Sequence, residues 1–444
     1  MAEVKEELRL TKEELRLTKE ELRLTKEENE KLKLRILDLS HKKTSTNSSI
    51  PPSSDIQKTT KSLRQKSDKK SGGQPGRKGT TLEFHSAPKV IDHIDDTCPA
   101  CGADYVDDPI FKERRQVFDL PTIVIQVFEH RIFERRCRCG VCSISSFPVD
   151  VKSPISYGRK IETLCGYYSA RQYMSIARIR EMFADVFNVP ISEGTIVNKI
   201  KSLAHRCMPQ YDEIKNDVQQ STCVGTDETG GKVNGKLRWL WTWQTRLVTF
   251  IIVSSNRGYE TIEKYFAEGF ANSILVHDCW KAHFITRAKG RQICMAHVLR
   301  ELQYFIERRN RWAYELTKLI WKSLALKNKM LINPDVNYDK QIKQIENTLQ
   351  DLLQAELHSK DKKLRTLKKR LNKYHEYLLT FLKVMEVPPD NNFSEQAIRN
   401  VKVKLKVSGQ FRSEQGADYY AILRSIIDTT IKRKANVLQV LANA

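Results

Sequence analysis

The sequence lacks any hydrophobic run long enough to cross a lipid bilayer. Its longest apolar stretch, LVTFIIV from Leu247, is far shorter than the roughly 20 residues that a transmembrane helix needs. The N-terminal segment is highly charged and has no apolar core of the kind found in signal peptides. We therefore expect a cytoplasmic protein with no membrane partner.

Acidic residues are also scarce relative to basic ones. The 444 residues include 54 Asp and Glu against 76 Lys and Arg, which leaves a net charge of +22. Such an excess indicates a polyanionic partner, and DNA is the first candidate, so we expect association with the nucleoid. A hydrophobic content of 40% is enough to build a core, and the length predicts two to four folded units.

Ten cysteines in a cytoplasmic protein indicate reduced thiols or a metal site rather than disulfides. Two motifs, CPACG and CRCGVC, flank a strand-like span inside a predicted β-rich, zinc ribbon-like module at residues 81–150. A structural zinc ion takes four ligands in a closed tetrahedral shell, which leaves no catalytic position. Four of five cysteines would bind it, and the spare residue of the second motif stays open: Cys98, Cys101, Cys137, Cys139 and Cys142.

The first 40 residues predict a coiled-coil helix. The heptad KEELRLT occurs three times in succession, with leucine at one core position and threonine at the other: Leu8, Leu15 and Leu22 at a, and Thr11, Thr18 and Thr25 at d. Asn29 continues the a series, where an asparagine tends to fix register. A homo-oligomer is the favoured interpretation, and a solvated single helix is the alternative. Residues 41–80 are rich in Ser, Lys, Pro and Gly and predict a flexible basic linker suited to DNA phosphates.

Residues 151–215 predict a helix-turn-helix domain. A first helix precedes a turn at 188–190, and Ser192 is a suitable N-cap for the second helix. The side chains that this second helix would present to a DNA groove include Ser192, Thr195, Asn198, Lys199 and Lys201. Plain helix packing is the alternative interpretation.

Strand patterns begin near Thr222 and place two acids at strand ends. Three strands, a helix and a fourth strand follow in residues 216–285, with Asp227 on the first strand and Asp278 at the end of the fourth. This order is that of a ribonuclease-H-like fold, in which the first and fourth strands are neighbours, so the two carboxylates should converge. Glu228 should point to the opposite face, because side chains alternate along a strand.

Glu395 is the third candidate acid. It lies in an otherwise basic helix of the segment 386–444, which we interpret as the second part of the catalytic domain after a helical insertion at 286–385. Three carboxylates can hold two magnesium or manganese ions for phosphoryl transfer. The basic residues expected to face the DNA backbone are Arg399, Lys402 and Lys404, followed by Lys406. Cys294 and His297 in CMAH are interpreted as packed side chains, since two ligands do not make a metal site.

The sequence resembles transposases of the insertion-sequence-66 family. The resemblance covers nearly all of the chain after the coiled coil and rests on several motifs together, among them KKSGGQPGRKG, the two cysteine motifs, TDETG, LVHD, QICMAHVLREL and DNNFSEQAIRN. It implies a multidomain α/β protein of the DDE type, with Asp227, Asp278 and Glu395 as the triad. It also implies a zinc-binding N-terminal region, recognition of terminal inverted repeats, and possible accessory proteins of the same element.

The expected function is therefore metal-dependent cleavage and strand transfer of double-stranded DNA. Water would first attack the phosphodiester at each element end, and the released 3′-hydroxyl would then attack target DNA. Two alternatives stay open at this stage. One is a DNA-binding regulator that has lost catalysis, and the other is a ribonuclease-H-like nuclease.

Overall fold

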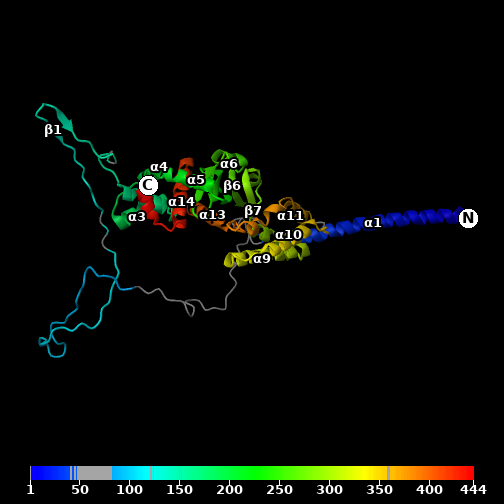
Figure 1. The fold of residues 1–444 in the computed structure, drawn as a ribbon, viewed down its shortest axis with the longest axis horizontal. Coiled ribbons are helices and arrows are strands. Elements are labelled where there is room, and N and C mark those ends of the chain that lie inside the picture. Colours follow the sequence, from blue (N-terminus) through cyan, green and yellow to red (C-terminus); the bar gives the residue numbers. More distant parts are fainter. Residues whose placement is uncertain are drawn as a thin grey trace.

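The computed structural model describes residues 2–40, 43–44, 47, 83–120, 123, 125–149, 151, 153–357 and 361–444. A five-stranded mixed sheet lies among helices, and one long N-terminal helix extends away from this body (Figure 1). The predicted linker 41–80 lies outside the described residues except for Lys43, Thr44 and Asn47. In the part of the chain that the structure describes, no helix has an apolar stretch long enough to span a membrane.

The N-terminal segment forms the continuous helix α1 (Ala2–Ser40), as its composition predicts. Glu, Lys, Leu and Arg are strong helix formers, and pairs such as Arg16 with Glu13 add support between successive turns. The a-position leucines are about half exposed, with Leu15 at 54%. Pairing of this helix with another copy stays a prediction.

Residues 83–149 are mostly extended and, where described, bury no apolar side chain. Regular strand is limited to the antiparallel hairpin of β1 (Glu134–Arg136) and β2 (Cys142–Ile144), so the segment contains less β-structure than we expected. A module without its own core must rely on another constraint to fold, and a bound metal is the common one in domains of this size.

Four helices follow: α2 (Arg159–Ala170), α3 (Ile176–Phe187), α4 (Glu193–Arg206) and α5 (Met208–Gln220). The α3–α4 connection has defined ends, since Asn188 adopts a left-handed conformation (φ 53°) and Ser192 caps α4. Phe183 and Ile196 meet in the small core between these helices. The predicted pair of helices and its turn are therefore present, whereas their binding to DNA stays a prediction.

The central sheet has the strand order β5-β4-β3-β6-β7. Its strands are β3 (Cys223–Val233), β4 (Lys236–Gln244), β5 (Thr249–Ser254), β6 (Phe270–His277) and β7 (Ala288–Ile293). The first three form antiparallel hairpins, and β3, β6 and β7 are parallel. The predicted neighbourhood of the first and fourth strands is confirmed, because Gly225 of β3 is in register with Val276 of β6.

Strand β7 corrects the predicted start of the helical insertion at residue 286. Its sequence, AKGRQI, contains mostly residues with low strand propensity, so its pattern does not predict a strand. The parallel register with β6 nevertheless places it at the edge of the sheet. Two short helices, α6 (Tyr259–Tyr265) and α7 (Lys281–Ile285), lie before it in the chain.

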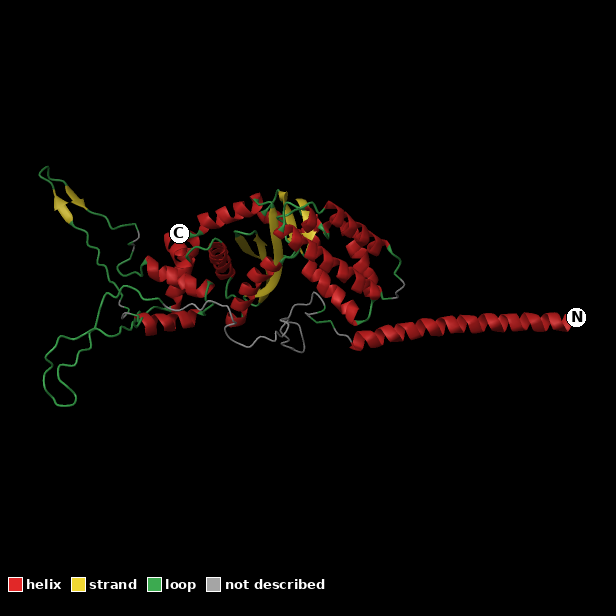
Figure 2. Ribbon diagram, turned by 60° about the horizontal axis from the view of Figure 1, so that its bottom comes forward, coloured by secondary structure: helices red, strands yellow, loops and turns green. Residues whose placement is uncertain are grey.

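The helical part begins after β7 and has its own apolar core. It contains α8 (Met295–Glu307), α9 (Arg311–Ile332), α10 (Asp339–Gln354), α11 (Lys362–Lys373), the 3₁₀ turn η2 (His375–Tyr377) and α12 (Thr380–Lys383). The chain then returns to the sheet through α13 (Asn392–Ser408), α14 (Glu414–Lys432) and α15 (Val437–Asn443). In Figure 2 the strands of the central sheet lie among helices, whereas the β1–β2 hairpin lies apart from them.

Helix α14 protects the open edge of the sheet. The backbone N–H groups of Thr249 and Ile251 on β5 donate to the hydroxyls of Thr429 and Ser425, at 3.0 and 2.9 Å. An unpaired strand edge would otherwise expose these donors to pairing with another chain. The β5 edge of the sheet is thereby covered by a helix.

Candidate active site

Asp227 and Asp278 lie at the same level of two adjacent strands. Gly225 of β3 is in register with Val276 of β6. Asp227 lies two residues after Gly225, and Asp278 lies two residues after Val276. The backbone N–H of Glu228 donates to Oδ1 of Asp227 at 2.9 Å, and that of Trp280 donates to Oδ1 of Asp278 at 2.8 Å. The structure thus brings together the two aspartates that the strand order predicted as neighbours.

The start of α13 is held directly against β3. Asn391 donates from Nδ2 to the carbonyl of Thr226 at 2.7 Å, and the hydroxyl of Ser394 donates to Oδ1 of Asn391 at 2.6 Å. This close approach requires Gly225, since a Cβ atom there would lie 2.7 Å from Oδ1 of Asn391. Glu395 follows in the first turn of α13, and its charge acts on Asp227.

The charges of the neighbouring acids act on Asp227. The pKa of Asp227 is raised well above its usual value, chiefly by burial and then by the charges of Glu228, Asp278 and Glu395. A half-buried group of like charges is costly without a cation, so this arrangement is suited to hold one. As the side chains stand, no three His, Cys, Asp or Glu groups among the described residues are close enough together to ligate an ion.

The carboxylate of Glu395 is turned towards two arginine side chains and one histidine side chain. Nη2 of Arg300 lies 2.6 Å from Oε1, Nη2 of Arg399 lies 3.4 Å from Oε2, and Nε2 of His297 lies 3.9 Å from Oε1. Sequence reasoning did not identify Arg300 as a site residue. Its one signal is a position three residues after His297 on α8, which places both side chains on one face of the helix.

Cys294 has a packing role, as expected. It is fully buried, and its Sγ accepts a hydrogen bond from the backbone N–H of Asn391 at 3.2 Å. Burial raises the pKa of its thiol to about 12, so it stays neutral. The residue therefore joins the β7–α8 junction to the start of α13.

Glu228 points away from the triad, in agreement with strand alternation. Its carboxylate is buried and pairs with Nη2 of Arg257 at 2.8 Å and Nε2 of His283 at 3.3 Å. Burial alone would raise the pKa of Glu228, but the hydrogen bond from His283 and the charge of Arg257 outweigh it, and the pKa is lowered.

Arg257, which pairs with Glu228, is also connected to Asp278 through Trp280. Its guanidinium lies over the rings of Trp239 and Trp280, with centroid distances of 4.6 and 3.8 Å. The indole N–H of Trp280 donates to the carbonyl of Arg257 at 3.1 Å, while its backbone N–H holds Asp278. The opposite face of the sheet therefore supports the position of one candidate catalytic carboxylate.

The candidate DNA contacts of α4 divide into two groups. Asn198 and Lys201 are exposed, whereas Ser192 and Thr195 bond to each other across the N-cap. Lys199 turns inward, since its Nζ donates to the carbonyl of Tyr157 at 2.7 Å. The cap hydroxyls and the Lys199 ammonium are thus already used within the domain.

The candidate DNA contacts of α13 divide in the same way. Arg399 is exposed and Lys402 is half-buried. Lys404 was expected to face the DNA backbone, but its side chain is buried and its Nζ donates to the carbonyl of Met174 at 3.1 Å. Burial lowers the pKa of Lys404 to about 8. The periodicity of the helix, rather than the charge of the side chain, decides which lysines reach the surface.

Each of the two cysteine motifs forms a turn that ends in a left-handed glycine, and the second turn is one residue shorter. In the first, Gly102 donates to the carbonyl of Cys98 and has φ 73°; in the second, Gly140 donates to the carbonyl of Cys137 and has φ 90°. Hydrogen bonds from backbone N–H groups of the same turns lower the pKa of the Cys98 and Cys137 thiols. Cys142 lies beyond the second turn, in β2.

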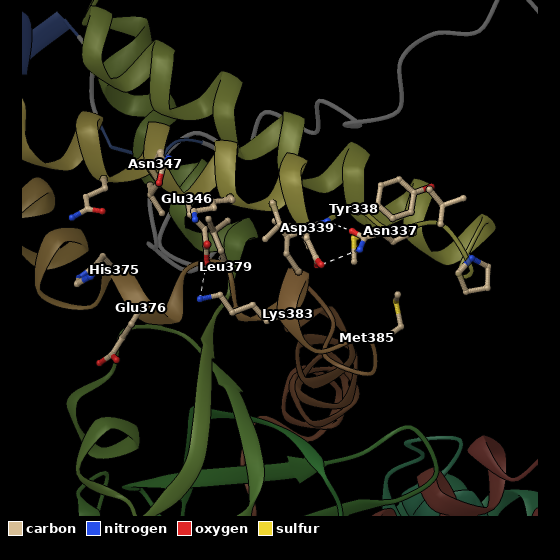
Figure 3. A pocket seen from close by; sticks show the side chains of 18 of the residues that line it. Asn337, Tyr338, Asp339, Glu346, Asn347, His375, Glu376, Leu379, Lys383 and Met385 are labelled. Atoms are coloured by element: carbon tan, nitrogen blue, oxygen red, sulfur yellow. Dashed lines mark hydrogen bonds and ion pairs between the residues drawn. The ribbon is translucent and has the colours of Figure 1, made fainter.

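A groove of about 940 Å³ lies in the helical part, between α9, α10 and the segment from η2 to Met385. Figure 3 shows its polar side chains, among them Glu346, which pairs with Lys383 at 2.6 Å. None of the three candidate acids lines it. It is therefore separate from the carboxylate site.

Three parts of the chain match known protein families. Residues 160–419 match the Transposase IS66 family, and residues 95–140 match the zinc-finger binding domain of transposase IS66. Residues 4–83 match a family of unknown function (DUF6444). No curated protein matches the chain. Because the first match spans more than half of the sequence and includes all three acids of the site, the chain belongs to the Transposase IS66 family.

Proposed function

We propose that the chain is a DDE-type DNA transposase that binds the inverted repeats of its element and catalyses metal-dependent cleavage and strand transfer. The observation that carries this proposal is the electrostatic effect of two carboxylates on a third: after burial and the charge of Glu228, the charges of Asp278 and Glu395 raise the pKa of Asp227. The three acids come from β3, the end of β6 and the start of α13. Membership of the transposase family supports the same assignment.

The sheet supports a ribonuclease-H-like catalytic domain. Its antiparallel β5-β4-β3 hairpins continue into parallel β6 and β7, so the first and fourth strands are central and adjacent. The helices from α8 to α12 interrupt this domain between β7 and α13. In this arrangement the two aspartates on the sheet and the glutamate on α13, which follows the interruption, belong to one catalytic domain.

The three acids are hard oxygen donors of the kind that magnesium or manganese prefers. Bound there, such ions would neutralise charge on the reacting phosphate and activate water or a 3′-hydroxyl. Asp227 would give up the proton that its raised pKa favours, and Trp280 would keep Asp278 oriented through its backbone N–H. The protein contributes positioning and electrostatic stabilisation, without a covalent intermediate.

DNA contact is assigned to the exposed residues of two helices. Asn198 and Lys201 on α4 are free to reach a groove, and Arg399 on α13 is 72% exposed beside the acids. Lys402 is a weaker candidate because it is half-buried, and Ser192 and Thr195 would contact phosphates only from their capping positions. Lys199 and Lys404 serve the fold instead.

Structural zinc is assigned to Cys98, Cys101, Cys137 and Cys139. The turns at Gly102 and Gly140 make the second motif a shorter counterpart of the first, with two cysteines before each glycine. The match to the zinc-finger domain ends at residue 140 and leaves Cys142 outside. Cys142 is therefore the spare cysteine of the five.

The α1 heptads favour a parallel homo-oligomer. With leucine at a, each repeat places Lys at e and Glu at g, as in Lys19 and Glu14. In a parallel pair Glu14 faces Lys19 of a second copy, whereas an antiparallel pair would place like charges together. Asn29 would fix the register that identical heptads leave open. Accessory proteins of the same element stay an expectation from the family.

A nicking assay tests the proposal. Purified protein, magnesium and a labelled duplex with the element's own end should give a cut at the junction with flanking DNA, and Asp278→Ala should bind the duplex but not cut it. Cutting by Asp278→Ala would remove this residue from the triad. Binding without cutting by the natural protein, also after its accessory proteins are added, would favour the non-catalytic regulator.

A further inference from the structure

The candidate acid on α13 carries an internal counter-ion. Arg300 contacts Oε1 of Glu395 at 2.6 Å, and both side chains are largely shielded, with 30% and 17% exposure. Arg399 reaches the other oxygen at 3.4 Å, but it is 72% exposed and such a pair contributes little. Arg300 is therefore the principal cation at a carboxylate that should serve a metal.

The backbone keeps Arg300 at this place. The N–H of Met295, at the start of α8, donates to the carbonyl of Pro389 at 2.9 Å, and Sγ of Cys294 accepts from Asn391. The start of α8 is thus fixed to the start of α13. If a metal takes over Glu395, the guanidinium loses its partner but stays beside the site, because hydrogen bonds join the start of its helix to the start of α13.

We propose that Arg300 is a further catalytic residue with two successive partners. In the metal-free protein it is the counter-ion of Glu395, and with metal and DNA bound it contacts the reacting phosphate. A guanidinium stays protonated and matches phosphate with two parallel donors, so it can stabilise the charge that develops there without proton transfer. This inference rests on the proposed transposase function.

Two measurements on Arg300→Gln should move in opposite directions. Mn²⁺ binding to the full-length, zinc-loaded protein without DNA should become roughly 3- to 10-fold tighter, since a competing cation is removed. Cleavage at saturating Mn²⁺ should fall roughly 100-fold, as when one transition-state donor is lost. Arg300→Lys should keep Mn²⁺ affinity near that of the natural protein and retain intermediate cleavage.

Arg238→Gln is a matched control. Arg238 also pairs at 2.6 Å, with Glu414, and is 21% exposed, but it lies opposite Gly231, four residues along β3 from Asp227. It should leave both Mn²⁺ affinity and cleavage unchanged, and thermal melting would confirm that each variant is folded. The control separates loss of the Glu395 contact from loss of any partly shielded ion pair.

Each result has a definite meaning. Unchanged or weaker Mn²⁺ binding by Arg300→Gln would overturn the counter-ion role, and an undiminished cleavage rate would overturn the phosphate role. If the natural protein neither binds Mn²⁺ at the acids nor cuts DNA, the proposed function fails and this inference fails with it. Mn²⁺ binding and cleavage by the natural protein with no change in the variant would overturn the inference alone.

Discussion

Two adjacent acids on β3 should respond to neutralisation in opposite ways. In the protein without magnesium, Asp227→Asn should raise the stability of the sheet domain, because burial and neighbouring carboxylates disfavour the Asp227 charge. Glu228→Gln should lower it, because Arg257 and His283 would lose their buried anion. The comparison is well controlled, because the two residues are neighbours in sequence and lie on opposite faces of the sheet.

The expected sizes follow from these environments. Relief of a buried polar group without adequate compensation is worth about 1–3 kcal/mol, which corresponds to a rise in Tm of roughly 2–12 °C for a domain of this size. Removal of one partner from a buried ion pair costs about 3–5 kcal/mol, or a fall of roughly 6–20 °C. The Asp227→Asn protein should nevertheless be unable to cut DNA.

The two effects also have opposite pH dependence. The native pKa of Asp227 is raised, so native Asp227 keeps a proton that the unfolded chain loses above about pH 4, and this residue destabilises increasingly as pH rises. The native pKa of Glu228 is lowered, so its stabilisation is present above about pH 4.5 and is lost as pH falls. Both substitution effects should therefore shrink towards pH 4.

Thermal melting of the zinc-loaded, magnesium-free protein between pH 4 and pH 8 measures both effects. The reasoning would be refuted if the two variants shifted Tm in the same direction at pH 7. A gain for Asp227→Asn that is larger at pH 4 than at pH 7 would refute the assigned pKa shift.

Three other expectations concern separate parts of the chain. Cys137→Ser should release zinc whereas Cys142→Ser should retain it, as zinc content after gel filtration would show; equal loss would contradict the assignment of the spare cysteine. Arg257→Lys should slow cleavage roughly tenfold with DNA affinity unchanged, because a lysine cannot stack as a plane on the two indoles. Nicking assays measure the cleavage rate and gel shifts measure the DNA affinity. Weaker DNA binding would indicate that Arg257 contacts DNA instead. Glu14→Lys should weaken self-association and the added change Lys19→Glu should restore it, measured by light scattering; no response would argue against a parallel α1 pair.

Much of the site could be predicted from local pattern. The alternation of side chains along β3 separates Asp227 from Glu228, and the structure places Glu228 with Arg257 and His283 on the other face. The order of strands likewise predicts that the segments carrying Asp227 and Asp278 are neighbours, as the β3–β6 register shows. These features depend on residues close in sequence or on one topological rule.

What could not be predicted depends on packing between distant segments. Strand β7 forms from a polar sequence because β6 offers it a parallel partner. Lys404 is buried because α13 meets the carbonyl of Met174, 230 residues away in sequence. Arg300 reaches Glu395 only because the β7–α8 junction is hydrogen-bonded to the start of α13. No pattern within one segment contains this information.

The central claim is that Asp227, Asp278 and Glu395 hold the catalytic metal together. Iron(II) in place of magnesium, with ascorbate and peroxide, cuts the polypeptide next to the bound ion, and mass spectrometry locates the cuts. We predict cuts near residues 227, 278 and 395, all suppressed by excess magnesium. Cuts at one of these positions alone, or only elsewhere in the chain, would contradict a shared metal site.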